Sequence, residues 1–100
     1  MASVTWTDPA LDDLREICEF ISRGSPRLAE IFAARAFTAT DRLNMFPSSG
    51  RIVPEFERQD MREIILGNYR IIYHVLPDEV EISAVVHGAR QVSSEILERK

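Results

Sequence analysis

Two short apolar runs separated by only two residues constrain this fold more than any other feature of the sequence. Residues 61–66 and 69–76 are rich in β-branched and aromatic residues, and Gly67-Asn68 stands between them. A two-residue connection of this kind is typical of a tight β-hairpin. A third such run, residues 80–87, follows a turn at Pro77-Asp78-Glu79. The second half of the chain is therefore predicted to fold as a three-stranded antiparallel meander.

The middle run alternates in a way that separates two faces. Successive side chains of a strand point to opposite sides of the sheet. One face is expected to carry Tyr69, Ile71, Tyr73 and Val75, and the other Arg70, Ile72, His74 and Leu76. Because both faces hold apolar residues, we expect helices to cover one face and the other face to be only partly exposed to water.

The first half of the chain carries signals for a short strand and two helices. Residues 3–6 are strand-forming, and Asp8-Pro9 and Ser25-Pro26 each place a capping residue before a proline that suits the first helical turn. The first helix is expected to end near Arg23-Gly24 and the second at Pro47. The apolar stripe expected on the first helix comprises Leu11, Leu14, Ile17, Cys18 and Ile21.

These signals define a fold class. Few residues separate the two helices, so they are expected to pack as an antiparallel hairpin. Residues 47–60 show no clear period and are expected to form a loop, of a length that is often functional, and residues 93–100 to add a last helical turn. The prediction is a single α+β domain over residues 1–100: an N-terminal strand, the helix hairpin, and a three-stranded antiparallel meander that forms one curled sheet.

Charge and composition exclude several functional classes. The chain has 100 residues and a net charge of -4, which argues against non-specific nucleic-acid binding through phosphate neutralisation. The single cysteine forms no internal disulfide, and the sequence has neither an apolar run of membrane-span length nor a signal peptide. The expectation is a cytoplasmic protein without membrane association. His74 and His87 do not have the spacing of metal ligands, so no metal and no cofactor are expected.

One set of polar residues has the chemistry of an anion-handling site. The set comprises Glu55, Arg62, Arg70, His87 and Arg90. Ribonucleases that use the 2′-hydroxyl of RNA need a base, an acid and cations that stabilise the phosphate. In one interpretation Glu55 or His87 transfers protons while the arginines hold the phosphate. In the other, each residue is structural, with Arg70 paired to a loop carboxylate such as Glu55 or Glu57.

The order of elements and a series of short motifs resemble the ParE/RelE superfamily of bacterial toxins, over nearly the whole chain. The motifs resembling the ParE branch are Trp6-Thr7, Ala10-Leu11, Asp13-Leu14, Ile17, Phe46-Pro47, Gly50-Arg51, Val53-Pro54-Glu55, Arg62-Glu63, Gly67, Tyr69-Arg70-Ile71, Tyr73 and Val86-His87-Gly88-Ala89-Arg90.

The resemblance implies the toxin of a type II toxin–antitoxin module. A ParD-like antitoxin would hold it inactive in a hetero-oligomer, which would reach operator DNA only through the antitoxin. ParE-like members are associated with inhibition of DNA gyrase, and RelE-like members with mRNA cleavage on the ribosome. RelE-like nucleases usually place a Tyr or His close to the C-terminus, and residues 91–100 contain neither. The favoured interpretation is therefore a non-catalytic gyrase inhibitor that causes growth arrest.

Two alternatives remain open, together with a prediction of the antitoxin interface. One alternative is a ribosome-dependent, metal-independent endoribonuclease that uses the polar set above. The other is a degenerate toxin that retains only antitoxin binding. Two helices over a curled sheet leave a groove for an amphipathic helix or an added strand. The candidate antitoxin contacts are Phe20, Phe37, Met61, Ile65, Arg70, Ile72, Leu76 and Arg90, and Arg51 joins the polar set as a candidate for toxic or framework function.

Overall fold

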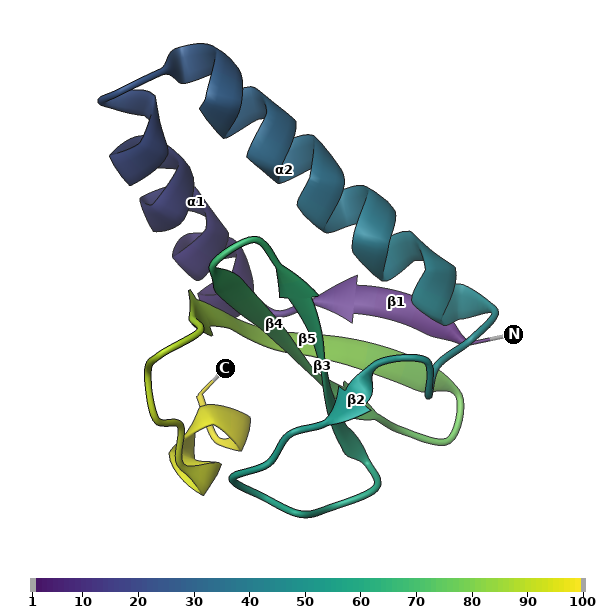
Figure 1. Ribbon diagram of the computed structural model, residues 1–100. Coiled ribbons are helices and arrows are strands. Elements are labelled where there is room, and N and C mark those ends of the chain that lie inside the picture. The colour runs from purple at the N-terminus through teal and green to yellow at the C-terminus, as the bar shows by residue number, and fades with distance from the viewer. Residues whose placement is uncertain (1, 100) are drawn as a thin grey trace.

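The computed structural model describes residues 2–99, which form a five-stranded sheet with a helix hairpin on one face (Figure 1). The order of strands across the sheet is β1-β5-β4-β3-β2. Their bounds are β1 Ser3–Trp6, β2 Arg51–Ile52, β3 Met61–Leu66, β4 Tyr69–Val75 and β5 Glu79–His87. The predicted antiparallel meander is confirmed as β3, β4 and β5. Gly67 opens the β3–β4 turn with a φ of +59°, a left-handed value that a glycine adopts without strain.

The predicted fold class is confirmed, and the complete sheet is mixed because the first strand is parallel to its neighbour. β1 pairs in parallel with β5, and its register runs from Ser3 beside Glu79 to Trp6 beside Ile82. Within the predicted loop, β2 pairs antiparallel with β3, placing Arg51 beside Glu63. A strand of two residues is too short to produce an alternating pattern, so β2 could not be predicted from the sequence.

The two helices begin where the sequence places them. α1 spans Asp8–Ser22 and α2 spans Pro26–Asp41. Ser25 caps α2 as expected, but Thr7 rather than Asp8 caps α1, because the Thr7 hydroxyl accepts a hydrogen bond from the Ala10 amide. Within residues 2–99, neither helix is long and apolar enough to cross a membrane.

The second helix ends earlier than the proline signal indicates. A 3₁₀ turn, η1 (Arg42–Asn44), follows α2 directly. At this point two hydrogen bonds join Asn44 and Ala2. The Ala2 amide donates to the Asn44 backbone carbonyl at 3.0 Å, and the Asn44 side-chain amide donates to the Ala2 carbonyl at 2.7 Å. The chain is therefore tied to the start of β1 several residues before Pro47.

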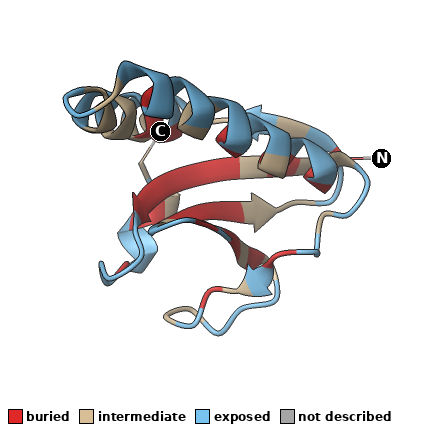
Figure 2. Ribbon diagram, turned by 45° about the horizontal axis from the view of Figure 1, so that its top comes forward, coloured by how far each residue is buried: buried red, intermediate tan, exposed pale blue. Residues whose placement is uncertain are grey.

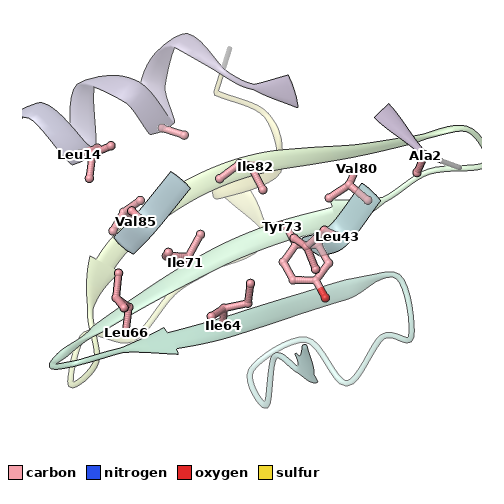
Figure 3. Packing of buried hydrophobic residues seen from close by; sticks show 12 residues of the cluster. Ala2, Leu14, Leu43, Ile64, Leu66, Ile71, Tyr73, Val80, Ile82 and Val85 are labelled. Carbon is pink, nitrogen blue, oxygen red and sulfur yellow. The ribbon is translucent and has the colours of Figure 1, made fainter. Parts of the chain in front are cut away.

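The main core lies between the helix hairpin and the sheet. The predicted face of β4 is confirmed, since Ile71 and Tyr73 are fully buried there beside Leu14 of α1 and Leu43 (Figure 3). Leu11 was expected on the buried stripe but is 40% exposed. The face of α1 that meets the sheet is centred on Ala10 and Leu14, and Leu11 lies about 100° around the helix from Ala10.

A second apolar cluster occupies the opposite face of the sheet. It consists of Val53, Met61, Ile72, Ala84, Val86, Val92 and Ile96. The short 3₁₀ helix η2 (Ser94–Leu97) lies on this side, away from α1 and α2, and supplies Ile96 (Figure 1). Figure 2 shows the strands as the most buried part of the molecule and the outer sides of the helices as exposed. η2 confirms the expected last turn, except that Lys100 lies outside the described residues.

Candidate functional site

Arg70 is the centre of a buried polar network on the second face of the sheet. Only 4% of the Arg70 residue is exposed to solvent. Its Nε donates to Glu63 Oε1 at 2.6 Å, and its two terminal nitrogens donate to the two carboxylate oxygens of Glu55, both at 2.7 Å. Nη1 also donates to the Arg90 carbonyl at 3.1 Å. The predicted pairing of Arg70 with a loop carboxylate is confirmed, and the paired guanidinium is removed from solvent.

The same contacts set the protonation of Glu55. The hydrogen bonds from the Arg70 guanidinium lower the pKa of Glu55 from 4.5 to about 2. The carboxylates of Glu55 and Glu63 in turn raise the pKa of Arg70. Glu55 also accepts from the Val92 amide at 3.3 Å. A carboxylate with so low a pKa is a weak proton acceptor at neutral pH.

Arg51 completes the network from the β2 strand. Its Nε donates to Glu63 Oε2, while 58% of its side chain remains exposed. Arg51 of β2, Glu63 of β3 and Arg70 of β4 thus form one network with Glu55 of the loop between β2 and β3. Its two arginines and two glutamates sum to zero formal charge. Charged side chains inside a protein are usually paired in this way, and the side chain of Glu63 is fully buried.

Arg62 lies on the other face of the sheet. It is directly opposite Tyr73, which faces the helices, whereas its neighbour Glu63 faces Arg70. Its guanidinium donates to the carbonyls of Gln59, Ser48 and Gly50 at 3.0, 3.2 and 3.0 Å. Arg62 therefore holds two loops together, and the fold does not place it beside Arg70 and Arg90.

His87 and Arg90 are exposed at the end of β5. His87 Nδ1 accepts from the Ala89 amide at 3.2 Å, and its ring and the Tyr69 ring form a T-shaped pair with centroids 5.7 Å apart. The Arg90 amide donates to the His87 carbonyl at 3.0 Å. Two open grooves meet at this corner, of about 460 and 240 Å³, and both are lined by Arg51, Arg70, Gly88 and Ala89. The corner therefore presents Arg51, His87 and Arg90 to solvent.

The candidate antitoxin contacts fall into two groups. Phe20 and Phe37 are exposed on the helices, Ile65 is half exposed on β3, and Leu76 is half buried. Met61 and Ile72, by contrast, are fully buried in the second apolar cluster. The expectation that they lie on an accessible face is corrected, because residues 53–56 and η2 cover them.

Two groups of polar residues were missed by the sequence reasoning. Glu63 occupies an inward position between Met61 and Ile65, and a charged residue in that alternation was a usable signal. Asp13 and Arg99 form an ion pair over 86 positions of sequence, for which no local signal exists. Among residues 2–99, no group of three His, Cys, Asp or Glu side chains is arranged to hold a metal ion.

The model of the family described as the ParE toxin of the type II toxin–antitoxin system parDE matches residues 4–92. The chain belongs to the ParE toxin family. Toxin RelE2 of Caulobacter vibrioides is 37% identical over 90 residues, covering 90% of this chain and 99% of the relative. Putative toxin Y4kP of Sinorhizobium fredii is also 37% identical over 90 residues, covering 88% of this chain and 90% of the relative.

Solved structures of toxin–antitoxin systems share the fold of this ParE-family chain. One is from the chromosomal ParDE system of P. aeruginosa, with a TM-score of 0.72 and 21% identity, covering 87% of this chain and 96% of that one. Another is from the RelBE2 complex of Mycobacterium tuberculosis, with a TM-score of 0.55 and 21% identity, covering 86% and 96%. At this identity the likeness concerns the fold, and it agrees with the predicted α+β class.

Proposed function

We propose that this type II toxin inhibits DNA gyrase by binding it, without chemistry of its own, and that a ParD-like antitoxin neutralises it in a hetero-oligomer. The observation that carries the proposal is the state of the residues a nuclease would need. Glu55 has both carboxylate oxygens bound by Arg70 and a pKa lowered to about 2. A group of this kind does not accept a proton readily near neutral pH.

The arginines support the same conclusion. Arg70 is matched by two carboxylates, and Arg62 lies on the opposite face bound to three carbonyls. Neither is free to stabilise the added charge of a pentacovalent phosphate. Residues 91–100 contain no Tyr or His. The polar set is therefore better suited to shaping a surface than to cleaving RNA.

A gyrase supercoiling assay tests the target. Purified wild-type toxin is expected to inhibit supercoiling at micromolar concentration, and Arg90→Ala to inhibit less, because Arg90 is exposed at the corner where both grooves meet. Arg58→Ala is the matched control, since Arg58 is also exposed but pairs with Asp60 elsewhere. Wild-type protein that is folded and leaves gyrase unaffected would exclude this target.

A ribosome-dependent nuclease is the second candidate, favoured by one observation. His87 is exposed beside the grooves lined by Arg51 and Arg90, where a phosphate has access. Primer extension on mRNA from induced cells separates the two functions, because only the nuclease creates new 5′ ends. New ends that disappear with His87→Gln would support the nuclease. Normal growth during strong expression of soluble wild-type protein would indicate a degenerate toxin.

A further inference from the structure

β1, the strand that closes the sheet beside β5, is itself unpaired on its outer side (Figure 1). The amides of Ser3 and Thr7 donate to carbonyls of β5 and of the turn before it, at 3.2 and 3.1 Å. Backbone groups of alternate residues point to the same side of a strand, so Val4 and Trp6 direct their amides and carbonyls outward. Within residues 2–99 the sheet places no strand there. Two residues of β1 are therefore available for strand pairing.

The apolar side chains of β1 are partly accessible from this outer side. Val4 and Trp6 face the helices and are half buried, whereas their partners on β5, Val80 and Ile82, are fully buried. The Trp6 ring contacts the Phe37 ring of α2, with centroids 5.1 Å apart, and Phe37 is 41% exposed. The helix side of β1 thus presents an aromatic surface next to the open backbone groups.

The opposite face of the sheet is polar and acidic at β1. In the parallel register Ser3 is opposite Glu79 and Thr5 is opposite Glu81, so these four side chains point away from the helices. Ser3 and Thr5 are exposed and short, and the exposed Asp78 adds a carboxylate at the adjoining turn. A long basic side chain that extends over Ser3 or Thr5 therefore meets negative charge.

The helix side of β1 carries acidic residues as well. Asp41 ends α2, directly before the η1 turn that is bound to the start of β1, and Asp8 follows β1 at the start of α1. Both are exposed, and within residues 2–99 neither forms a salt bridge. Arg42 lines the groove between α2 and β3, and Arg99 is paired with Asp13. The charge around β1 is thus negative on both faces of the sheet.

We infer that the outer side of β1 docks an extended basic segment of a partner protein, which adds a strand to the sheet. Side chains of an added strand alternate between the two faces. One set packs against Trp6 and Phe37, and the other extends toward Glu79, which lies two strand spacings away, about 10 Å. Alternating apolar and basic residues are the pattern that this surface recognises. The inference goes beyond the proposed function, because it does not depend on which target the toxin has.

A second copy of this chain is a poorer occupant. Pairing of two β1 strands would bring Asp41, Asp78 and Glu79 of each copy close to those of the other. Like charges held together across an interface oppose association. The charge around β1 therefore selects a basic partner over self-association.

A peptide with this pattern tests the surface directly. The probe is a short peptide in which Lys alternates with Val, and its control has Glu in place of each Lys. Trp6 is the only tryptophan of the chain, so its fluorescence reports binding beside β1. The full-length toxin is expected to bind the Lys peptide at least about tenfold more tightly than the Glu peptide, with a smaller difference at high salt. Equal affinities, or no binding of the Lys peptide, would overturn the inference.

Charge reversal separates docking at β1 from general attraction to an acidic protein. Glu79→Lys is expected to weaken binding of the Lys peptide by about fivefold or more, because Glu79 is opposite Ser3 on the face that the lysines meet. Glu57→Lys is the matched control, since it changes the net charge equally and lies in the loop between β2 and β3, at the other side of the sheet. Equal weakening by both variants would overturn the inference.

Amide exchange of the wild-type chain gives a readout that needs no variant. The Val4 and Trp6 amides are expected to exchange at least about tenfold more slowly when the Lys peptide is bound than in the free toxin. The Ser3 and Thr7 amides, which are already bonded on the β5 side, should change less. Unchanged exchange at Val4 and Trp6 with the peptide bound would overturn the inference. Slow exchange in the free toxin that depends on its concentration would show self-pairing, which would also overturn it.

Discussion

At the scale of single residues, the charged side chains inside this fold bind other parts of the chain. Arg70 connects two carboxylates and a carbonyl, and Arg62 connects three carbonyls in two loops. A guanidinium has five N–H donors in a fixed plane and so can satisfy several acceptors at once. Arg70 and Arg62, which first suggested catalysis, thus have structural roles as hydrogen-bond donors to acceptors of the same chain.

Glu55→Gln tests the ion pair through its pH dependence. A carboxyl group whose pKa is lowered on folding contributes stability above its ordinary pKa, and the contribution is lost as the pH falls through the folded value. We expect the variant to be less stable than wild type by about 2 kcal/mol at pH 7. The difference should narrow between pH 4.5 and about 2, where wild-type Glu55 takes up its proton.

The measurement is denaturant unfolding across this pH range. Glu57→Gln is the matched control, because Glu57 lies in the same loop and is exposed. A stability difference for Glu55→Gln that does not change with pH would contradict the assignment.

Gly50→Ala tests a close backbone contact. A Cβ at this position would lie 2.6 Å from the Glu63 carbonyl and 2.6 Å from the Tyr73 hydroxyl, both fixed within the sheet. We expect the free energy of unfolding to fall by about 2 kcal/mol, as for other overpacked sites. Gly24→Ala serves for comparison, since its nearest contact is 3.7 Å away. If both variants lose the same stability, the close contact is not the cause.

At the scale of elements, the sheet is closed at one edge by residues from distant parts of the chain. β1 pairs with the first part of β5, and Asp13 from α1 together with Arg99 covers the next part. Ser83 is the extra residue of a bulge, since Ile72 pairs with Ala84 and Tyr73 with Ile82. A bulge leaves a backbone group without a ladder partner, and Arg99 binds the Ser83 carbonyl.

Arg99→Ala should release the C-terminal segment from α1 and β5. The ion pair with Asp13 and the bond to Ser83 are its connections to those two elements. We expect faster amide exchange in residues 92–98, with less change in the strands of the meander, because local opening requires only the segment to leave. Arg58→Ala, which removes a surface ion pair elsewhere, should leave exchange in this segment unchanged. Equal exchange in both variants would show that Arg99 does not hold the segment.

At the scale of the whole molecule, the sheet separates two apolar cores. The helices cover one face, while residues 53–56 and η2 cover the other. A chain of 100 residues has little core to spare, so the second cluster matters for stability. It also keeps Met61 and Ile72 out of reach of any partner that does not displace the C-terminal segment.

Truncation after Gln91 tests the second core. It removes Val92 and Ile96, which are each 9% exposed, and uncovers Met61 and Ile72. We expect a loss of about 3 kcal/mol in the free energy of unfolding, from burial of two apolar side chains. Ile96→Ala should produce a smaller loss in the same denaturant titration. A truncated chain as stable as wild type would show that η2 is not part of the core.

The sequence by itself determined the local structure. The proline signals placed the starts of both helices, and the two apolar runs around Gly67-Asn68 placed the β3–β4 hairpin and both faces of β4. It also anticipated a carboxylate partner for Arg70 in the loop. These features depend on residues within a few positions of each other, and side-chain periods of 3.6 and 2 make them readable. The ordered motifs were likewise enough to indicate the family.

Only the tertiary structure decided which distant residues meet. β1 pairs with β5 across most of the chain, Asp13 with Arg99 across 86 positions, and β2 is too short to have a period. The same alternation that placed Arg70 inside put Arg62 on the other face, so Arg62 did not join the other residues of the predicted polar set. Pairing over such distances is fixed by how helices and sheet pack as a whole, and no window of sequence contains that information.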